Sequence, residues 1–206
     1  MPMLLYLHGF NSSPESKKAL QTQRWYADNA ADINFVCPAL PPFADRAMGM
    51  LRSLVEAQIE GQLEGQLEGQ PPEPVYLIGS SMGGFFATCL AEQYGLRAVL
   101  INPAVSPGRG LDKWLGENRN YTTDEKWVFE PQHIAEYIAL DPGDIKDKSH
   151  YKVLLQTGDE VLDYRDAQRR YQGCDMVIEE QGDHSFTTYH QHLAAIHQFL
   201  VSAPSS

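Results

Sequence analysis

The sequence predicts an α/β fold, in which a mostly parallel sheet of about six strands carries helices on both faces. Short apolar runs rich in branched residues alternate with longer helix-like segments along the chain, an order typical of parallel sheets. In addition, the apolar run at residues 74–78 leads through a glycine- and serine-rich turn into a helix-like segment. We expect a single domain over residues 1–206, since a chain of this length buries a substantial core.

Each predicted strand follows one apolar run and ends where glycine, proline or polar residues begin. The strands are expected near residues 3–7, 33–36, 75–79, 98–101, 152–157 and 176–180. The first helix is expected to start at Ser13 and Pro14, because serine is a favoured N-cap and proline a favoured first helical residue. The last helix is expected over residues 187–201, where Ile196 and Leu200 share one face at helical spacing.

Three segments interrupt this regular order. Residues 56–72 repeat a Glu-Gly-Gln-Leu unit and are read as a low-complexity helix end or loop, because each glycine costs about 1 kcal/mol against alanine within a helix. Such a stretch is either a spacer or a docking element. Residues 38–43 and the insert at residues 103–150, a candidate small cap, lie beside the expected strand ends. The aromatic residues of the insert either wall a substrate pocket or anchor the insert to the core.

The turn after the third strand carries the pattern Gly-x-Ser-x-Gly at residues 79–83. Between a strand and a helix this pattern is typical of a nucleophile elbow, which presents its central serine, here Ser81, above the sheet. Gly79 and Gly83 leave room where side chains would collide. The helix that follows favours negative charge at its N-terminus. The sequence therefore predicts Ser81 as a nucleophile.

Two later strands supply residues of the kind that activate a serine, a base and an acid that orients the base. Asp159 follows the strand near residues 152–157, and His184 follows the strand near residues 176–180. Because the carboxyl ends of parallel strands meet at one edge of a sheet, we expect both residues to lie beside Ser81 as a catalytic triad.

Other residues compete for the roles of base and orienting acid. Glu160 and Asp163 follow Asp159 on the same loop; Glu160 is expected to point elsewhere, and Asp163 fits the N-cap of the next helix. His8 either braces its own loop by a hydrogen bond or acts as a base. Three further histidines have spacings on the last helix that do not converge on a metal ion, and we expect no metal and no cofactor. They are His190, His192 and His197.

The loop after the first strand begins His8-Gly9-Phe10. Histidine–glycine motifs at this point supply one backbone N–H of the oxyanion hole in esterases, and the residue after the nucleophile supplies the other. We therefore expect the N–H groups of Phe10 and Met82 to bind the oxyanion.

Together these motifs resemble those of the α/β-hydrolases, and more narrowly those of the small bacterial YqiA-type esterases. The narrower resemblance rests on LLYLHGFNSSP near the start, GSSMGG, Asn102-Pro103-Ala104-Val105, QTGDEVLDYR and the Gly-x-His-x-Phe around His184. It implies a serine esterase that forms an acyl-enzyme from carboxylic esters or acyl thioesters, with Ser81, Asp159 and His184 as its triad. A full-sized α/β-hydrolase has two strands ahead of the oxyanion loop's strand, so this chain is expected to lack both.

The alternatives from other classes are a non-catalytic binding protein on the same fold, an acyltransferase and a C–C bond hydrolase that use the same triad. Water access to the pocket would separate the enzymes.

The charge balance also limits the function. There are 16 Lys and Arg residues against 27 Asp and Glu residues, for a net charge of −11. This argues against nucleic acid or an anionic membrane as a partner. The three cysteines, Cys37, Cys89 and Cys174, indicate free thiols in a reducing cytoplasm. The apolar start at residues 3–7 is too short for a signal peptide or a membrane span. The oligomeric state is left open.

Overall fold

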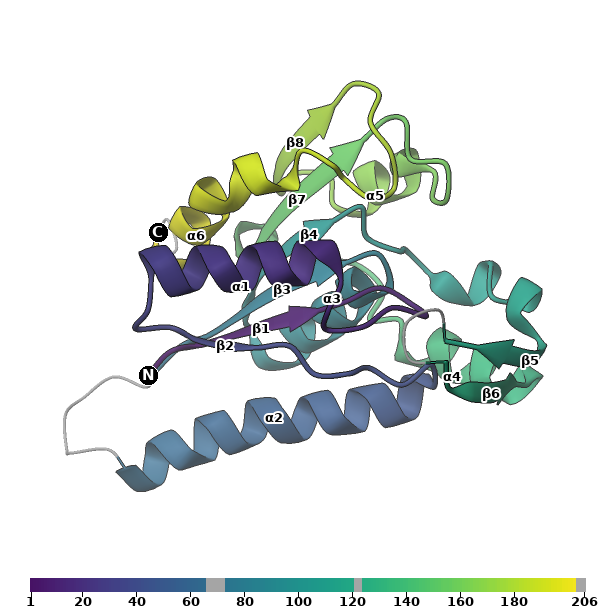
Figure 1. Cartoon of the computed structure of the whole chain (residues 1–206), viewed down its shortest axis with the longest axis horizontal. Coiled ribbons are helices and arrows are strands. Elements are labelled where there is room, and N and C mark those ends of the chain that lie inside the picture. Colours follow the sequence, from purple (N-terminus) through teal and green to yellow (C-terminus); the bar gives the residue numbers. More distant parts are fainter. Residues whose placement is uncertain (66–72, 121–123, 203–206) are drawn as a thin grey trace.

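The computed structural model describes residues 1–65, 73–120 and 124–202 of the 206-residue chain. Its centre is a six-stranded sheet with the strand order β2-β1-β3-β4-β7-β8 (Figure 1). All neighbouring pairs in this sheet are parallel. The strands are β1 (Met3–Leu7), β2 (Asn34–Val36), β3 (Val75–Ser80), β4 (Arg97–Ile101), β7 (Tyr151–Gln156) and β8 (Asp175–Glu179).

This sheet confirms the predicted α/β fold, and each predicted strand end lies within one residue of the observed one. Continuous apolar sequence was the strongest indication of these strands, because parallel strands that are covered on both faces are buried along their whole length. All residues of β1 and of β7 are buried. β1 leads directly into the loop that begins at His8.

Helices cover both faces of the sheet. They are α1 (Lys17–Asn29), α2 (Ala44–Gly65), α3 (Met82–Tyr94), α4 (Pro131–Leu140), α5 (Tyr164–Arg170) and α6 (Leu193–Val201). Helices α1 and α6 pack on one face, where they contact Leu4 and Tyr6 of β1. The opposite face of β1, with Leu5 and Leu7, belongs to the core under α2 and α3. Alternate residues of one strand thus enter two separate cores.

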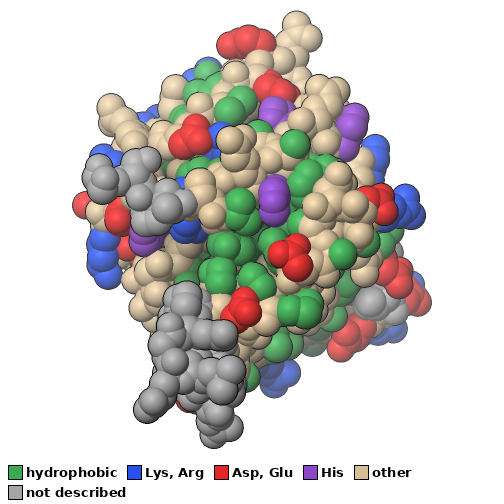
Figure 2. All heavy atoms as spheres, turned by 90° about the vertical axis from the view of Figure 1, so that its left-hand side faces the viewer, with side chains coloured by type: hydrophobic (Ala, Val, Ile, Leu, Met, Phe, Trp, Pro, Cys, Tyr) green, Lys and Arg blue, Asp and Glu red, His purple; other side chains and the backbone are tan. Residues whose placement is uncertain are grey.

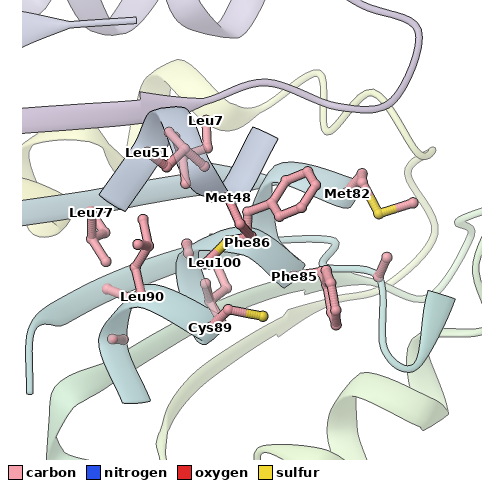
Figure 3. Close-up of a cluster of buried hydrophobic side chains, with 14 of the residues drawn as sticks. Leu7, Met48, Leu51, Leu77, Met82, Phe85, Phe86, Cys89, Leu90 and Leu100 are labelled. Carbon is pink, nitrogen blue, oxygen red and sulfur yellow. The ribbon is translucent and has the colours of Figure 1, made fainter. Parts of the chain in front are cut away.

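The core under α3 holds this helix, and with it the turn before it, rigidly on the sheet. Phe86 and Leu90 of α3 lie against Leu7 and Leu100 of the strands, with Met48 of α2 beside them (Figure 3). All of these side chains are almost fully buried. A position at the N-terminus of α3 is therefore fixed by close packing rather than by loop contacts.

The insert between β4 and β7 leaves the sheet at the carboxyl ends of the strands, where its two-stranded hairpin lies at the right of Figure 1, and it returns to the amino end of β7. It contains the 3₁₀ turns η1 (Pro107–Arg109), η2 (Asp112–Trp114) and η3 (Lys148–His150), the antiparallel strands β5 (Gly116–Arg119) and β6 (Lys126–Phe129), and α4. The β5–β6 hairpin was not predicted from the sequence. Its short strands are mostly exposed, so they lack the apolar runs that marked the strands of the main sheet.

One aromatic ring of the loop after β1 packs against four aromatic residues of the insert. Phe10 packs against Trp114 and Trp127, with ring centroids 5.1 and 5.6 Å apart, and against Phe129 and Tyr137 at 6.0 and 6.5 Å. Anchoring is one of the two roles considered for the aromatic residues of this insert. It couples the position of the insert to that of the loop expected to form the oxyanion hole.

Both predicted helix starts were wrong. Helix α1 begins at Lys17 with Ser16 as its N-cap; Ser13 and Pro14 instead enter a turn in which the N–H of Ser16 donates to the carbonyl of Ser13 at 3.0 Å. The last helix begins as the 3₁₀ turn η4 (Tyr189–His192) before α6. Proline and serine favour tight turns as well as helix starts, so the local pattern did not separate the two.

Helix α2 runs into the low-complexity segment as far as Gly65, so the start of residues 56–72 is the expected helix end. Residues 66–72 lie outside the described residues.

No helix in the described part of the chain combines the length and hydropathy that a membrane span requires. Figure 2 shows the end of the molecule where the sheet strands begin; there, hydrophobic side chains gather at the centre and acidic and basic ones lie around them.

Candidate active site

Ser81 lies between the end of β3 and the first residue of α3. Its backbone has φ 56° and ψ −121°, a conformation that L-residues rarely adopt and that is retained where the surrounding structure holds it. A Cβ at Gly83 would overlap the carbonyl oxygen of Leu7, and one at Gly79 would overlap that of Gly83. The two glycines therefore let the turn pack tightly against β1, as the sequence predicted.

The structure brings Ser81, His184 and Asp159 into one hydrogen-bonded chain. His184 Nε2 lies 3.0 Å from Ser81 Oγ, and His184 Nδ1 lies 2.8 Å from Asp159 Oδ2. The Asp159 carboxylate can only accept a hydrogen bond, so the Nδ1 atom of His184 carries the proton. The Nε2 atom can then accept from the hydroxyl of Ser81. The Asp159 side chain is 2% exposed and that of His184 is 21% exposed. The base thus meets solvent while its acidic partner is shielded.

The acids that compete with Asp159 have other partners. Asp163 is the N-cap of α5 and accepts from the N–H of Arg165 at 3.0 Å. Glu160 accepts from the backbone N–H of His184 at 3.0 Å. That hydrogen bond, the largest of several causes, lowers the pKa of Glu160, so its carboxylate stays ionised. Asp159 itself is held in place because its Oδ1 accepts from the N–H groups of Val161 and Leu162, both at 2.9 Å.

The buried amide side chains of Asn102 and Gln156 hold the loop that carries His184. Asn102, at the end of β4, donates from Nδ2 to the carbonyl of Asp183 at 3.1 Å, and its Oδ1 accepts from the N–H of Gln156 at 3.0 Å. Gln156 in turn accepts from the N–H of Asp183 at 3.0 Å and donates to Glu179 at 2.6 Å. Both side chains are almost fully buried. One hydrogen-bond network therefore joins the ends of β4, β7 and β8 to the loop that carries His184.

His8 braces its own loop. Its Nε2 accepts from the N–H of Leu40 at 3.0 Å, and its Nδ1 donates to the carbonyl of Gly9 at 2.9 Å. One nitrogen accepts and the other donates, so the ring is neutral. Burial lowers the pKa of His8, and the Gly9 carbonyl only partly opposes this. Of the two roles considered for His8, these contacts match the bracing one.

The expected oxyanion donors, Phe10 and Met82, both belong to segments that adjoin Ser81. Gly9 approaches it so closely that a Cβ there would lie 3.4 Å from the Cβ of Ser81. Phe10 follows Gly9 and lines the same pocket as Ser81. Met82 is the first residue of α3, and its N–H is among those that a helix leaves without an intrahelical acceptor.

A pocket of about 400 Å³ opens beside Ser81 and His184. Its walls come from the loop after β1, from the start of α1 and from residues 185–187. A second space, between the loop after β1, residues 40–42 and Tyr137, has a volume of only about 10 Å³, which is about one water molecule. The described residues of segments 38–43 and 103–150, which were candidates for pocket walls, do not line the larger pocket.

The contributions of α1, Asn102 and Gln156 to the site were not predicted from the sequence. Asn102 follows one predicted strand and Gln156 lies next to the end of another; polar residues are common at such positions, so no local signal marked them as partners of the His184 loop. Lys17 and Lys18 follow a predicted helix start and were given no role from the sequence, since only the packing of α1 on the sheet brings them to the pocket. Within the described residues, no group of three or more His, Cys, Asp and Glu side chains is placed to hold a metal ion.

The sheet, the elbow at Ser81 and the strand-end positions of Asp159 and His184 define a protein of the α/β-hydrolase superfamily. Solved structures have the same fold. Est1E from Butyrivibrio proteoclasticus, with ferulic acid bound, matches with a TM-score of 0.69 at 13% identity over 98% of this chain and 88% of that one. The mouse α/β hydrolase domain-containing protein 10 matches with a TM-score of 0.68 at 15% identity over 96% and 89%.

Within this superfamily, the chain belongs to UPF0227, described as an uncharacterised protein family, whose model matches residues 3–201. A UPF0227 protein from Serratia proteamaculans (strain 568) is 26% identical over 199 residues, which cover 96% of this chain and 98% of the relative. A UPF0227 protein from Vibrio atlanticus (strain LGP32) is equally similar, at 26% over 199 residues. These matches confirm the resemblance drawn from the sequence motifs.

Proposed function

We propose that the protein is a serine esterase that hydrolyses carboxylic esters, acyl thioesters among them, through an acyl-enzyme. The observation that carries the proposal is the continuous hydrogen-bonded chain from Asp159 through His184 to Ser81. The serine at its end has a strained backbone at the N-terminus of a helix. A serine hydroxyl becomes a strong nucleophile only when a positioned base takes its proton, and these residues supply that base and its orientation.

In the proposed reaction, Ser81 Oγ attacks the carbonyl carbon of the ester while its proton moves to His184 Nε2. Asp159 holds the imidazole in one tautomer and stabilises the imidazolium that forms. When the tetrahedral intermediate collapses, the bond to the leaving alkoxide or thiolate breaks and His184 returns the proton to it. Water then attacks the acyl-enzyme by the same steps and releases the acid.

The negative oxygen of each tetrahedral intermediate is bound by the N–H groups of Phe10 and Met82. The positive end of the α3 dipole adds to this stabilisation. Removal of a single donor from an oxyanion hole costs about 10²–10³-fold in kcat in well-studied hydrolases. The Phe10 ring is held by the aromatic residues of the insert, which supports a fixed position for its N–H.

Hydrolysis is favoured over transfer to another acceptor by the exposure of the site. His184 is 21% exposed and borders the 400 Å³ pocket, so water reaches the acyl-enzyme. The main alternatives are an acyltransferase with the same triad and a non-catalytic binding protein on this fold. The reaction needs no metal or cofactor. The three free cysteines, Cys37, Cys89 and Cys174, support the proposal that the enzyme acts in a reducing cytoplasm.

Turnover of short aryl esters by two serine variants tests the proposal. Ser81→Ala should lower kcat by about 10³-fold or more, because the nucleophile is lost. Ser80→Ala is the matched control, since Ser80 is the neighbouring serine and lines the same pocket; it should keep most of the turnover. A wild-type protein that is folded and hydrolyses no ester would contradict the esterase. A larger share of acyl transfer than of hydrolysis at modest alcohol concentrations would favour the acyltransferase.

A further inference from the structure

The pocket beside Ser81 has an unusual charge for this protein. The chain carries a net charge of −11, yet the charged side chains among the described residues that line the pocket are two lysines, Lys17 and Lys18, and none is Asp or Glu. Both lysines lie in the first turn of α1, whose N-cap Ser16 lines the pocket as well and forms no capping hydrogen bond with its side chain.

Lys18 is held where it reaches this pocket. Its Nζ donates to the carbonyl of Ser185 at 2.7 Å, directly after His184. An ammonium has three donors, so two remain for another acceptor. Burial lowers the pKa of Lys18 to about 8, although the negative charges of Asp183 and Asp159 oppose this shift. The side chain is therefore mostly protonated at neutral pH.

A buried hydroxyl at the same pocket also has no partner. The Tyr6 side chain is fully buried and lines the pocket, and its hydroxyl makes no hydrogen bond within the described residues. Burial raises the pKa of Tyr6 well above its usual value, so the group remains a donor. A buried donor without an acceptor is destabilising, and this one lines the same pocket as Lys17 and Lys18.

We propose that this pocket binds an anionic group, a carboxylate or a phosphate, carried by the ester that Ser81 attacks. The inference rests on the proposed esterase function and names its substrate class. Lys18 and Lys17 supply the charge, the first turn of α1 supplies N–H donors, and Ser81 lies on the wall of the same pocket. The anionic group thus occupies the α1 side of the site while the scissile carbonyl meets Ser81.

Matched pairs of esters test this preference. In the first pair, 4-carboxyphenyl butyrate and 4-carbamoylphenyl butyrate, the leaving group carries a carboxylate or its neutral amide. In the second pair, monophenyl glutarate and its terminal amide, the acyl group carries the difference. A third substrate, 4-(butyryloxy)phenyl phosphate, separates phosphate from carboxylate. Each kcat/KM is divided by the rate constant for alkaline hydrolysis of the same ester, so that chemical reactivity cancels.

For at least one of these anions, the charged ester should exceed its neutral partner by about tenfold or more in kcat/KM. The Lys17→Gln, Lys18→Gln double variant should bring this ratio close to one. Lys18→Arg, which keeps the charge, should retain most of it. The control is Lys146→Gln, since Lys146 is exposed and precedes the amino end of β7, at the opposite edge of the sheet; its ratio should equal that of the wild type.

The ratio also separates binding from structural damage. If loss of the Lys18 bond to Ser185 merely loosened the His184 loop, both esters of a pair would slow equally and the ratio would not change. A wild-type ratio near one for every anion, or a ratio that survives in the double variant, overturns the inference while the esterase stands. Absence of turnover with all five esters overturns both.

Discussion

Ser81, His184 and Asp159 divide the chemistry between a strained nucleophile, a partly exposed base and a shielded acid. Each residue meets its partner at 3.0 Å or less, although the three come from separate strand ends. The base and the acid each have a nearby residue of the same type, His8 and Asp163, that contacts the site's loops without entering this chain. These two neighbours are natural controls for the roles proposed here.

The first prediction separates the two histidines. His184→Ala should lower turnover by about 10³-fold or more, because Ser81 loses its base. His8→Ala removes the acceptor for the N–H of Leu40 and should lower thermal stability while leaving clear residual turnover. Kinetics with an aryl ester and thermal melts measure both effects. If the folded His8 variant lost as much turnover as the His184 variant, His184 would not be the base.

The pKa of His8 adds a second readout to this comparison. Burial lowers it in the folded state, so between that value and about 6.5, the usual value for histidine, the unfolded chain binds more protons than the folded one. Stability therefore falls as the pH drops below about 6.5. In the His8→Ala variant, the loss of unfolding free energy between pH 7 and pH 5 should be smaller than in the wild type. A slope that is unchanged would contradict a buried neutral His8.

The second prediction concerns the two aspartates. Asp159→Asn should lower kcat by about 10³–10⁴-fold, because the amide no longer selects the tautomer in which Nε2 accepts from Ser81. Asp163→Ala should cost about 1 kcal/mol of stability and little activity, since Asp163 caps α5. Kinetics and denaturant unfolding of the two variants give the comparison. The reverse pattern would transfer the orienting role to Asp163.

At the scale of elements, the site depends on strand ends that are tied to one another. Asn102 and Gln156 link the ends of β4 and β7 to the loop after β8. The sequence predicted that these ends would meet, because parallel strands share an edge. It did not predict the amides between them, since hydrogen bonds between distant segments depend on register and loop path. The same limit applies to the start of α1, whose residues reach the pocket only through packing.

The third prediction tests this link. Asn102→Gly suits the backbone, because Asn102 has φ 40°, and it removes only the side chain that holds Asp183 and Gln156. Unfolding free energy should fall by about 1–3 kcal/mol, and kcat should fall more than KM changes, since His184 is less well held. Thr88→Val is the control; it also removes buried hydrogen bonds, to Gly84 and Tyr171. That variant should lose stability without a comparable loss of kcat, and equal losses of kcat in both would contradict the positioning role.

At the scale of the whole molecule, the regular elements were predictable and the irregular ones were not. Apolar runs placed the four inner strands within one residue, because burial on both faces requires such runs, and shorter apolar runs placed the partly exposed edge strands β2 and β8 equally well. The exposed β5–β6 hairpin and the true start of α1 at Lys17 left no comparable pattern. The predicted candidate triad lies together in the structure because all three members follow strand ends. Its catalytic role remains a prediction, and so does that of the backbone donors.

One covalent measurement tests that central role most directly. The folded protein is treated with a fluorophosphonate, which reacts with serines activated as nucleophiles, and the adduct is mapped by mass spectrometry. A single adduct on Ser81 is expected, absent from Ser81→Ala and strongly slowed in His184→Ala. Labelling of another serine, such as Ser80, or no labelling of a protein shown to be folded, would contradict both the nucleophile and the esterase.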